Sequence, residues 1–416
     1  MDQIVDQTDL TDAKTFLSGV PHDYFTALRR HDPVHWHEEA DGPGFWCITK
    51  YDDVTALSRD PKRFSSAAEN GGHRIFDEVD RRDMGTDEPG VSMISQDPPI
   101  HTSVRKTMLP TMRAGYLHSM EDKIRARTRR LFDGMAGQEN VDWVEAIAAP
   151  LPIETLADLM DIDDEHHAKL FEWSNAIIAE ADPEMRPSPE YMEQTWLEMA
   201  QFAGGLYGER VGKDGTDILS LLMNMPVNGQ PISVKDYLAN FGLLIVGGNE
   251  TTRNSITGSI MAFTEFPDQR QLLIDQPELI PSAVAEIIRW VTPVLHMRRT
   301  AMEDVELRGK TIRKGDKVLL WYVSGNRDED IFDDPFTFDI TRMHKFGNRV
   351  MHLGFGKGEH MCLGRKLAEM QLHIYLEELL KTYPKAVQTA EPRRVESNFV
   401  TGFKDLPVRL QGAAEG

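Results

Sequence analysis

The spacing of apolar residues between positions 117 and 223 predicts a series of amphipathic helices. In the stretch EDKIRARTRRLFDGM, for example, Ile124, Leu131 and Phe132 fall on one side of a helix and charged residues on the other. A longer apolar segment, residues 232–263, reads ISVKDYLANFGLLIVGGNETTRNSITGSIMAF. At 1.5 Å per residue, a helix over this segment is about 48 Å long and crosses a whole domain.

The long segment contains a start signal and a weak point. Ser233, with Asp236 three residues later, is typical of a helix N-terminus because the serine oxygen caps a free backbone N–H. Positions 247–252 read Gly-Gly-Asn-Glu-Thr-Thr, and glycines and β-branched residues are poor helix formers. This stretch predicts either a kink or close-packing point, or a local widening of the helix beside a functional site.

Two other stretches alternate apolar and polar residues, as short strands do. PVHWHEEADGPGFWCITKY, residues 33–51, predicts a hairpin that turns at Asp41-Gly42-Pro43-Gly44. VELRGKTIRKGDKVLLWYV, residues 305–323, predicts antiparallel strands with turns at Arg308-Gly309 and Lys314-Gly315. The chain therefore combines a β portion with its helices.

No repeat, low-complexity tract or Gly/Ser linker divides the 416 residues. We therefore predict a single domain over 1–416. Its fold class is mainly α with a smaller antiparallel β region, the β-rich portion lying near 30–60 and 295–325.

Composition and charge exclude several classes of protein. The net charge of −21 repels phosphates, so no nucleic-acid partner is expected. Two cysteines are too few for a disulfide scaffold and suit a reducing compartment. The acidic start lacks the pattern of a signal peptide, and no apolar run approaches the roughly 20 residues of a membrane span. The sequence predicts a cytoplasmic protein without a membrane anchor.

One cysteine, Cys362, lies in the glycine-rich stretch FGKGEHMCLG. It has no cysteine neighbour at the spacing of zinc or iron–sulfur ligands. Apolar residues recur at helical spacing after it: Leu363, Leu367, Met370 and Ile374. Cys362 is thus predicted at the N-terminal end of a helix, where partial positive charge favours thiolate. A nucleophilic thiol and an inert buried cysteine are alternatives, but the flanking glycines favour a loop that holds a thiolate against a flat cofactor.

The pattern Phe355-x-x-Gly358-x-x-x-Cys362-x-Gly364 resembles the haem-binding loop of the cytochrome P-450 superfamily. The resemblance implies the cytochrome P-450 fold and haem b (iron protoporphyrin IX) as cofactor. It further implies that Cys362 is the metal ligand and that Phe355 belongs to the cofactor-binding loop.

The stretch SAVAEIIRWVTP places Glu286 and Arg289 on one helical face, a spacing that elsewhere usually gives a surface ion pair. The resemblance implies instead a buried structural pair. The family often adds a downstream arginine where this chain has Thr337, and Arg342 is the expected substitute.

The resemblance also assigns residues around the cofactor. Glu250 and Thr251 are implied as the catalytic acid and alcohol that relay protons to dioxygen. The haem propionates are implied to bind basic residues, since arginine matches a carboxylate in a bidentate way: His101, Arg105, Arg299 and His360. Arg298, beside Arg299, leaves open which of the two faces the haem.

These residues together imply a monooxygenase that uses dioxygen and takes electrons from a ferredoxin and an NAD(P)H-dependent ferredoxin reductase. Two other classes stay open. A haem-based sensor has no need of the Glu250–Thr251 pair, and a peroxygenase needs hydrogen peroxide but no electron donor.

More narrowly, VGGNETTRNSI, PVLHMRRTAMED and KGDKVLLWYVSGNRDE resemble the bacterial linalool 8-monooxygenase branch, and ENGGHRIF, from Glu69 to Phe76, favours it. The alkane terminal hydroxylases share MRRTA and KGDKV. The implied substrate is slim and apolar, an acyclic monoterpenoid such as linalool hydroxylated at a terminal methyl; alkane or fatty-acid terminal hydroxylation is the alternative. The expected pocket residues are Leu243, Val246, Leu295, Met297 and Val400.

The ferredoxin is expected to dock on the cysteine side, where basic residues offset the negative chain. Lys357, Arg365 and Lys366 flank Cys362. Further cations precede or occupy the next helix: Lys106, Lys123, Arg125, Arg127, Arg129 and Arg130. These cations are predicted either to extend the docking patch or to pair with nearby carboxylates.

Overall fold

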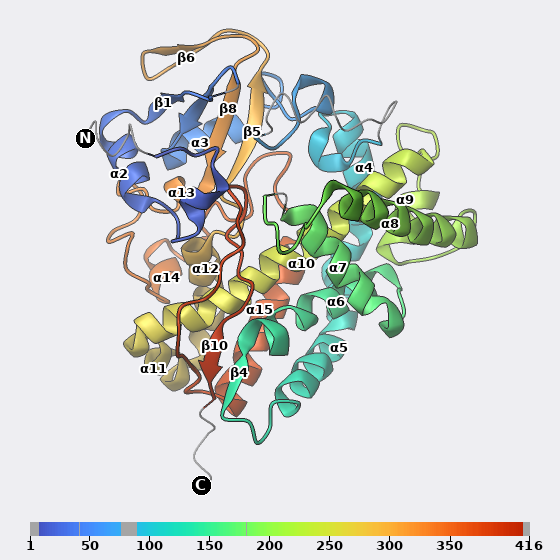
Figure 1. Cartoon of the computed structure of the whole chain (residues 1–416), viewed down its shortest axis with the longest axis vertical. Coiled ribbons are helices and arrows are strands. Elements are labelled where there is room, and N and C mark those ends of the chain that lie inside the picture. The colour runs from blue at the N-terminus through green and yellow to red at the C-terminus, as the bar shows by residue number, and fades with distance from the viewer. Residues whose placement is uncertain (1–7, 41, 76–89, 180, 411–416) are drawn as a thin grey trace.

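The computed structural model describes residues 8–40, 42–75, 90–179 and 181–410. Asp41 of the predicted hairpin turn and Phe76 of the ENGGHRIF stretch lie outside them. Helices form most of the molecule, and the largest sheet lies at one end, near the N-terminus (Figure 1). The prediction of a mainly α chain with a smaller β region is therefore confirmed.

The predicted long helix is α10 (Val234–Glu265), which runs through the middle of the molecule (Figure 1). Ser233 caps it, with its hydroxyl oxygen accepting the N–H of Asp236 at 3.0 Å. The chain stays α-helical through 247–252, so no break interrupts α10 there. The close-packing interpretation fits Gly248, where a Cβ would lie 2.9 Å from Leu156 of α6 (Pro150–Met160).

The other α-helices are α2 (His22–His31), α3 (Tyr51–Ser58), α4 (Ile100–Met108), α5 (Ala114–Asp133), α7 (His167–Ile178), α8 (Pro189–Arg210), α9 (Ile218–Asn224), α11 (Pro267–Asp275), α12 (Ile280–Val291), α13 (Tyr322–Gly325), α14 (Arg342–Lys345) and α15 (Arg365–Thr382). A π-helical turn (Val144–Ala148) precedes α6. None of the described helices is long and apolar enough to cross a lipid bilayer.

The strands form a five-stranded sheet in the order β1-β2-β8-β5-β3, a three-stranded sheet β4-β10-β9 and the pair β6-β7. Their bounds are β1 (Val34–His37), β2 (Phe45–Ile48), β3 (Phe64–Ser65), β4 (Asn140–Asp142), β5 (His296–Ala301), β6 (Val305–Leu307), β7 (Lys310–Ile312), β8 (Lys317–Trp321), β9 (Val387–Gln388) and β10 (Pro407–Arg409).

The hairpin β1–β2 forms as predicted, with Val34 opposite Ile48 and His37 opposite Phe45. One pair departs from the antiparallel prediction, because β2 and β8 run parallel. These strands come from distant parts of the chain, so no tight turn forces them to be antiparallel. The turn at Lys314-Gly315 joins β7 to a different sheet and makes no hairpin between β7 and β8.

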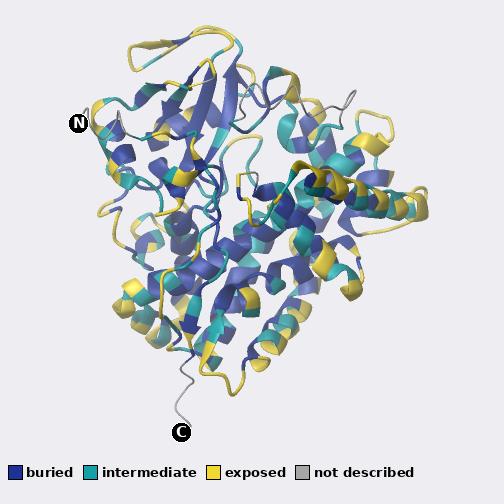
Figure 2. Cartoon of the chain, in the orientation of Figure 1, coloured by how far each residue is buried: buried dark blue, intermediate teal, exposed yellow. Residues whose placement is uncertain are grey.

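The core surrounds the second half of α10, where buried residues are continuous with those of α12 and α15 (Figure 2). Ile124 and Phe132 of α5 are buried and Leu131 is half-buried, so α5 turns its predicted apolar side inward. Exposed residues gather on the outer sides of α8, α5 and α11 (Figure 2).

Candidate functional site

A cavity lies between α10, α15, α4 and β5, beside the loop that precedes α15. Its volume is about 1520 Å³ with the open mouth included, more than a drug-sized molecule requires. The structure brings together at its wall most of the site residues predicted from the sequence: His101, Arg105, Leu243, Thr251, Met297, Arg299, Phe355, His360 and Cys362.

Cys362 is held in a tight loop next to the N-terminus of α15. Its N–H donates to the carbonyl of Phe355 at 2.8 Å. Gly358 has a φ of +70°, and a Cβ there would lie 2.1 Å from the carbonyl oxygen of Ser58. Only glycine therefore lets the loop pass α3 so closely.

Burial raises the pKa of the Cys362 thiol, while the N–H of Gly364 and the nearby Arg105 and Arg365 lower it. The thiolate thus lacks full compensation from the protein itself. A bound metal cation would supply it, since coordination deprotonates a thiol. The donor is a single sulfur with no cluster of three or more further metal-binding side chains among the described residues. This arrangement suits an iron whose other ligands come from a porphyrin.

Basic residues from α4, β5 and the cysteine loop meet at another part of the wall. The rings of His101 and His360 lie 4.1 Å apart. Within the described part of the chain, neither nitrogen of His101 has a hydrogen-bond partner, nor does Nε2 of His360. Arg105 and Arg299 line the same wall, and burial lowers the pKa of each.

Buried cations and imidazoles are unfavourable without anionic or hydrogen-bonding partners. Burial is the main cause that lowers the pKa of His101 to about 4, and the positive charge of Arg105 is the second. Burial, followed by Arg299 and His101, lowers the pKa of His360 to about 2. The wall therefore fits a ligand that brings carboxylates, as haem does with its propionates.

The alternation along β5 decides between the two adjacent arginines. Met297 and Arg299 line the cavity. Arg298 lies against Gly71, where a Cβ would be 2.0 Å from its Nη2. Successive side chains of a strand point to opposite faces, so this choice could have been made from the sequence once β5 was assigned.

The proposed acid and alcohol on α10 occupy different surroundings. Thr251 lines the cavity, and its hydroxyl donates to the carbonyl of Gly247 at 3.0 Å. Glu250 is not among the cavity-lining residues. Its carboxylate accepts hydrogen bonds from Arg253 at 2.7 Å and from Asn254 at 3.2 Å.

Three expected pocket residues lie behind the wall instead of in it. Leu295 packs in a buried cluster with Trp321. Val246 and Val400 pack with Val294 and Met297, which do line the cavity. Lining residues that the sequence reasoning missed include Leu244, Thr252, Ser255, Val294, Tyr322 and Gln371. Leu244, seven residues before Thr251, and Ser255, four after it, could have been found from the helical period.

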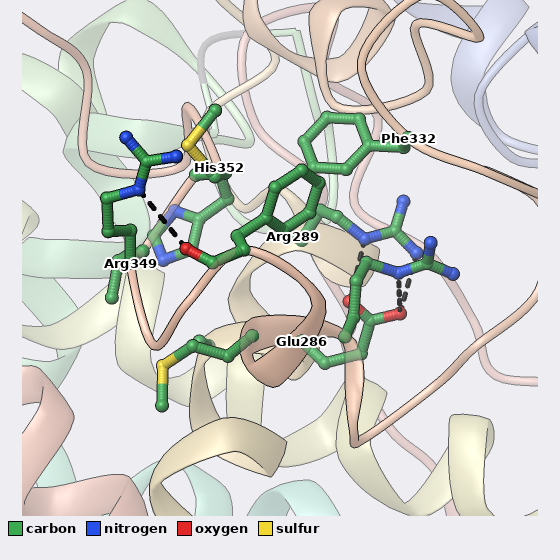
Figure 3. A pocket seen from close by; sticks show the side chains of 11 residues that line it. Glu286, Arg289, Phe332, Arg349 and His352 are labelled. Carbon is green, nitrogen blue, oxygen red and sulfur yellow. Dashed lines mark hydrogen bonds and ion pairs between the residues drawn. The ribbon is translucent and has the colours of Figure 1, made fainter.

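Glu286 and Arg289 form the expected buried pair, 2.7 Å apart with each side chain 2% exposed. Figure 3 shows the two side chains facing each other, with Phe332 nearby. Arg342 donates to Glu286 at 3.2 Å and so provides the third partner proposed for it. The carbonyl oxygen of Thr337 accepts a hydrogen bond from Arg289 and another from Arg342.

Comparisons with known proteins identify the family. The sequence profile described as Cytochrome P450 matches residues 158–410. The chain is 45% identical to linalool 8-monooxygenase of Pseudomonas putida, over 98% of this chain and 99% of that one. It is 37% identical to a methyl-branched lipid omega-hydroxylase of Mycobacterium tuberculosis, over 92% of this chain and 90% of that one. A cytochrome P450 of Mycobacterium marinum, solved in complex with pseudoionone, superposes with a TM-score of 0.88 at 33% identity, over 98% of each chain. The chain therefore belongs to the cytochrome P450 family of haem-thiolate monooxygenases.

Proposed function

We propose that the protein hydroxylates an acyclic monoterpenoid such as linalool at a terminal methyl group. The observation that carries this proposal is the 45% identity to linalool 8-monooxygenase over nearly the whole of both chains. The cavity supports it, because several residues of its wall are apolar, among them Leu243, Leu244, Val294 and Met297. A slim hydrocarbon chain is favoured at such a wall by the burial of apolar surface.

The chain's residues take distinct roles in this proposal. Haem b, bound through the Cys362 thiolate, would supply dioxygen binding and the oxidising chemistry. Arg105, Arg299 and the His101–His360 pair would hold its propionates through charge-assisted hydrogen bonds. Thr251 would place a hydroxyl in the cavity for proton transfer to dioxygen, with Glu250 behind it as the acid.

A spectral titration tests the substrate. The purified haem protein would be titrated with linalool, octane, a fatty acid and a steroid. We expect linalool to give a clear low-to-high-spin shift and, on turnover, a product hydroxylated at a terminal allylic methyl. A shift with octane or the fatty acid but none with linalool would overturn the proposal.

The second candidate is terminal hydroxylation of an alkane or a lipid chain. It is supported by the 37% identity to the methyl-branched lipid omega-hydroxylase. The same titration separates the two candidates. Turnover with hydrogen peroxide alone, without reduced ferredoxin and NAD(P)H, would instead indicate a peroxygenase.

We infer that the electron donor is a small acidic ferredoxin that docks beside Cys362. Burial lowers the pKa of Lys357, and Arg59 and Arg365 lower it further, so three cations gather at the cysteine loop. Lys366 is exposed next to Arg365. We call these four residues the docking patch. A local positive patch attracts an acidic partner even on a chain with a net charge of −21.

The cations of α5 do not extend the docking patch as free charges. Each lies within 4 Å of a carboxylate from α6 or α15: Lys123 of Asp158, Arg125 of Glu377 and Glu378, Arg127 of Asp158, Arg129 of Glu378, and Arg130 of Glu154. The α5 cations were predicted either to extend the docking patch or to pair with nearby carboxylates, and these contacts show that they pair. The docking proposal rests on the patch around the loop alone.

Reversing two charges tests the docking patch. We expect Arg365→Glu with Lys366→Glu to slow the first electron transfer and to flatten its salt dependence, while the substrate-induced spin shift stays intact. Arg313→Glu with Lys314→Glu, exposed at the β7–β8 turn, makes the same charge change as a control. Equal reduction kinetics in the two double variants would show that the donor docks elsewhere.

A further inference from the structure

Residues 90–97, which we call the wall segment, contribute to the cavity just before α4 begins. Met93 and Ile94 belong to this segment, and both line the cavity. The segment contains one 3₁₀ turn, Met93–Ser95. So short a turn satisfies few of the segment's own backbone N–H groups, and other elements have to supply partners for the rest.

Two side chains of α10 supply these partners. The N–H of Val91 donates to Oδ1 of Asp236 at 2.8 Å, and the N–H of Met93 donates to Oδ1 of Asn240 at 2.9 Å. Asp236 and Asn240 are four residues apart and so lie on one face of the helix. Asn240 is fully buried, and its Nδ2 donates to the carbonyl of Asp236 at 2.7 Å. Both ends of the amide are therefore used, which fixes the direction of its Oδ1.

The wall segment is held at both of its ends. At Gly90 a Cβ would lie 2.0 Å from the carbonyl oxygen of Lys235, so the segment lies directly against the first turn of α10. At the other end, Oδ1 of Asp97 accepts the N–H of Ser66, next to β3, at 2.9 Å. Met93 and its neighbour Ile94 thus lie between one attachment to α10 and another beside the largest sheet.

Asn240 acts on the cavity without reaching it. It is not among the lining residues, whereas Leu243 and Leu244, one helical turn later, are. If the Asn240 oxygen were removed, the buried N–H of Met93 would lose its partner, which is unfavourable. The wall segment would then move away from α10 to find another partner, and the cavity would widen at this end.

We propose that Asn240, assisted by Asp236, is a positioning residue that holds the wall segment against α10 and so makes the cavity select slim substrates. This inference rests on the proposed apolar substrate and names a residue that selects it. Neither side chain lines the cavity, so the effect is on substrate binding and not on the reaction itself.

A spin-shift titration of the haem-loaded protein tests the effect on binding. Asn240→Leu keeps the approximate size of the side chain and removes the oxygen. We expect the apparent Kd for linalool to rise about tenfold, the effect of one buried N–H left without a partner. A steroid, which is wider, should bind no more weakly than it does to the wild type. The turnover rate at saturating linalool should stay within about twofold, because the reacting groups are unchanged.

Hydrogen–deuterium exchange without substrate tests the contact itself. We expect the amide of Met93 to exchange at least about tenfold faster in Asn240→Leu than in the wild type. Asp236→Ala, which removes the acceptor of Val91, should change the exchange and the Kd in the same direction but by less, because Asp236 is only half-buried. Asp236→Asn keeps an oxygen at that position and should keep both wild-type values.

Gln269→Leu is the matched control. Oε1 of Gln269 accepts the N–H of Ile340 at 2.9 Å, a contact of the same kind and length, and neither residue lines the cavity. We expect this variant to lower stability while the linalool Kd and the exchange of the wall segment stay at their wild-type values.

The proposal is overturned if Asn240→Leu keeps the wild-type exchange at Met93 or the wild-type Kd. It is also overturned if Gln269→Leu raises the Kd as much. The exchange is measured without substrate, so it does not depend on the choice between linalool and alkane. If linalool gives no spin shift with the wild type, the proposed substrate is wrong, and the Kd of each variant is measured with the compound that does give one.

Discussion

Two glutamate–arginine pairs in this molecule have the same spacing and nearly the same geometry. Glu286–Arg289 lies on α12 and Glu250–Arg253 on α10. In each, the charged atoms are 2.7 Å apart and both side chains are 2% exposed. The sequence suggested a structural role for the first pair and, for Glu250, a role in proton transfer.

The pairs differ in what surrounds them. Arg289 also donates to the carbonyls of Asn326 and Pro335, so it ties α12 to the chain that leads to the cysteine loop. Arg253 reaches Asn175 of α7 and the carbonyl of Phe403, and its partner Glu250 directly precedes Thr251 of the cavity wall. The i,i+3 spacing therefore predicts that a pair forms, while the neighbours decide whether it is only structural.

Arg289→Leu should have the largest effect. It leaves Glu286 buried with a single arginine, Arg342, and breaking a buried pair costs about 3–5 kcal/mol, a large share of a typical folding stability. Urea unfolding measures the loss. Arg349→Leu is the control, because Arg349 lines the same pocket on the side away from the pair (Figure 3), is exposed and donates to the carbonyl of Phe346. Similar midpoints for the two variants would mean that the pair is not structural.

Glu250→Gln tests whether the pair on α10 has a role beyond structure. If Glu250 relays protons, turnover should slow by about 10²-fold, the lower range for removal of a general acid. The linalool spin shift should persist, because Glu250 does not line the cavity. Glu286→Gln is the matched variant, and we expect it to lower the unfolding midpoint more than Glu250→Gln does. A Glu250→Gln protein that is less stable but turns over normally would make both pairs structural.

Thr251→Ala should separate electron consumption from product formation. We expect NAD(P)H consumption to continue while most of the reducing equivalents appear as hydrogen peroxide, because the cavity hydroxyl that directs protons is gone. The measurement is the ratio of product to peroxide. Thr257→Ala removes a hydroxyl that donates to the Arg253 carbonyl outside the cavity wall, and it should leave that ratio unchanged. Equal ratios in the two variants would contradict the role of Thr251.

Local patterns in the sequence predicted the elements that local forces determine. The cap at Ser233, the hairpin β1–β2 and the helix after Cys362 follow from neighbouring residues, and all three form. The parallel pairing of β2 with β8 depends on contacts between distant segments, which no local pattern records. For the same reason Val246 and Val400 could be predicted as apolar neighbours of the site but not as residues behind its wall.

Glu378 of α15 gives the smallest effect, because it is buried but two of the cations that bind it, Arg129 and Lys381, are largely exposed. It accepts from Arg125 and Arg129 of α5 and from Lys381. Burial alone would raise the pKa of Glu378, but hydrogen bonds from Arg129, Lys381 and Arg125 overcome burial and lower the pKa to about 2 from 4.5. The folded pKa is below the unfolded one, so this stabilisation is complete above about pH 4.5 and is lost as pH falls toward 2.

Glu378→Gln should cost about 1 kcal/mol or less at pH 7, since Arg129 is largely exposed, and should flatten the fall in unfolding free energy below pH 4.5. Glu193→Gln, on the exposed side of α8, should keep the wild-type acid curve. If Glu378→Gln also keeps the wild-type acid curve, these cations do not bind Glu378 strongly in solution.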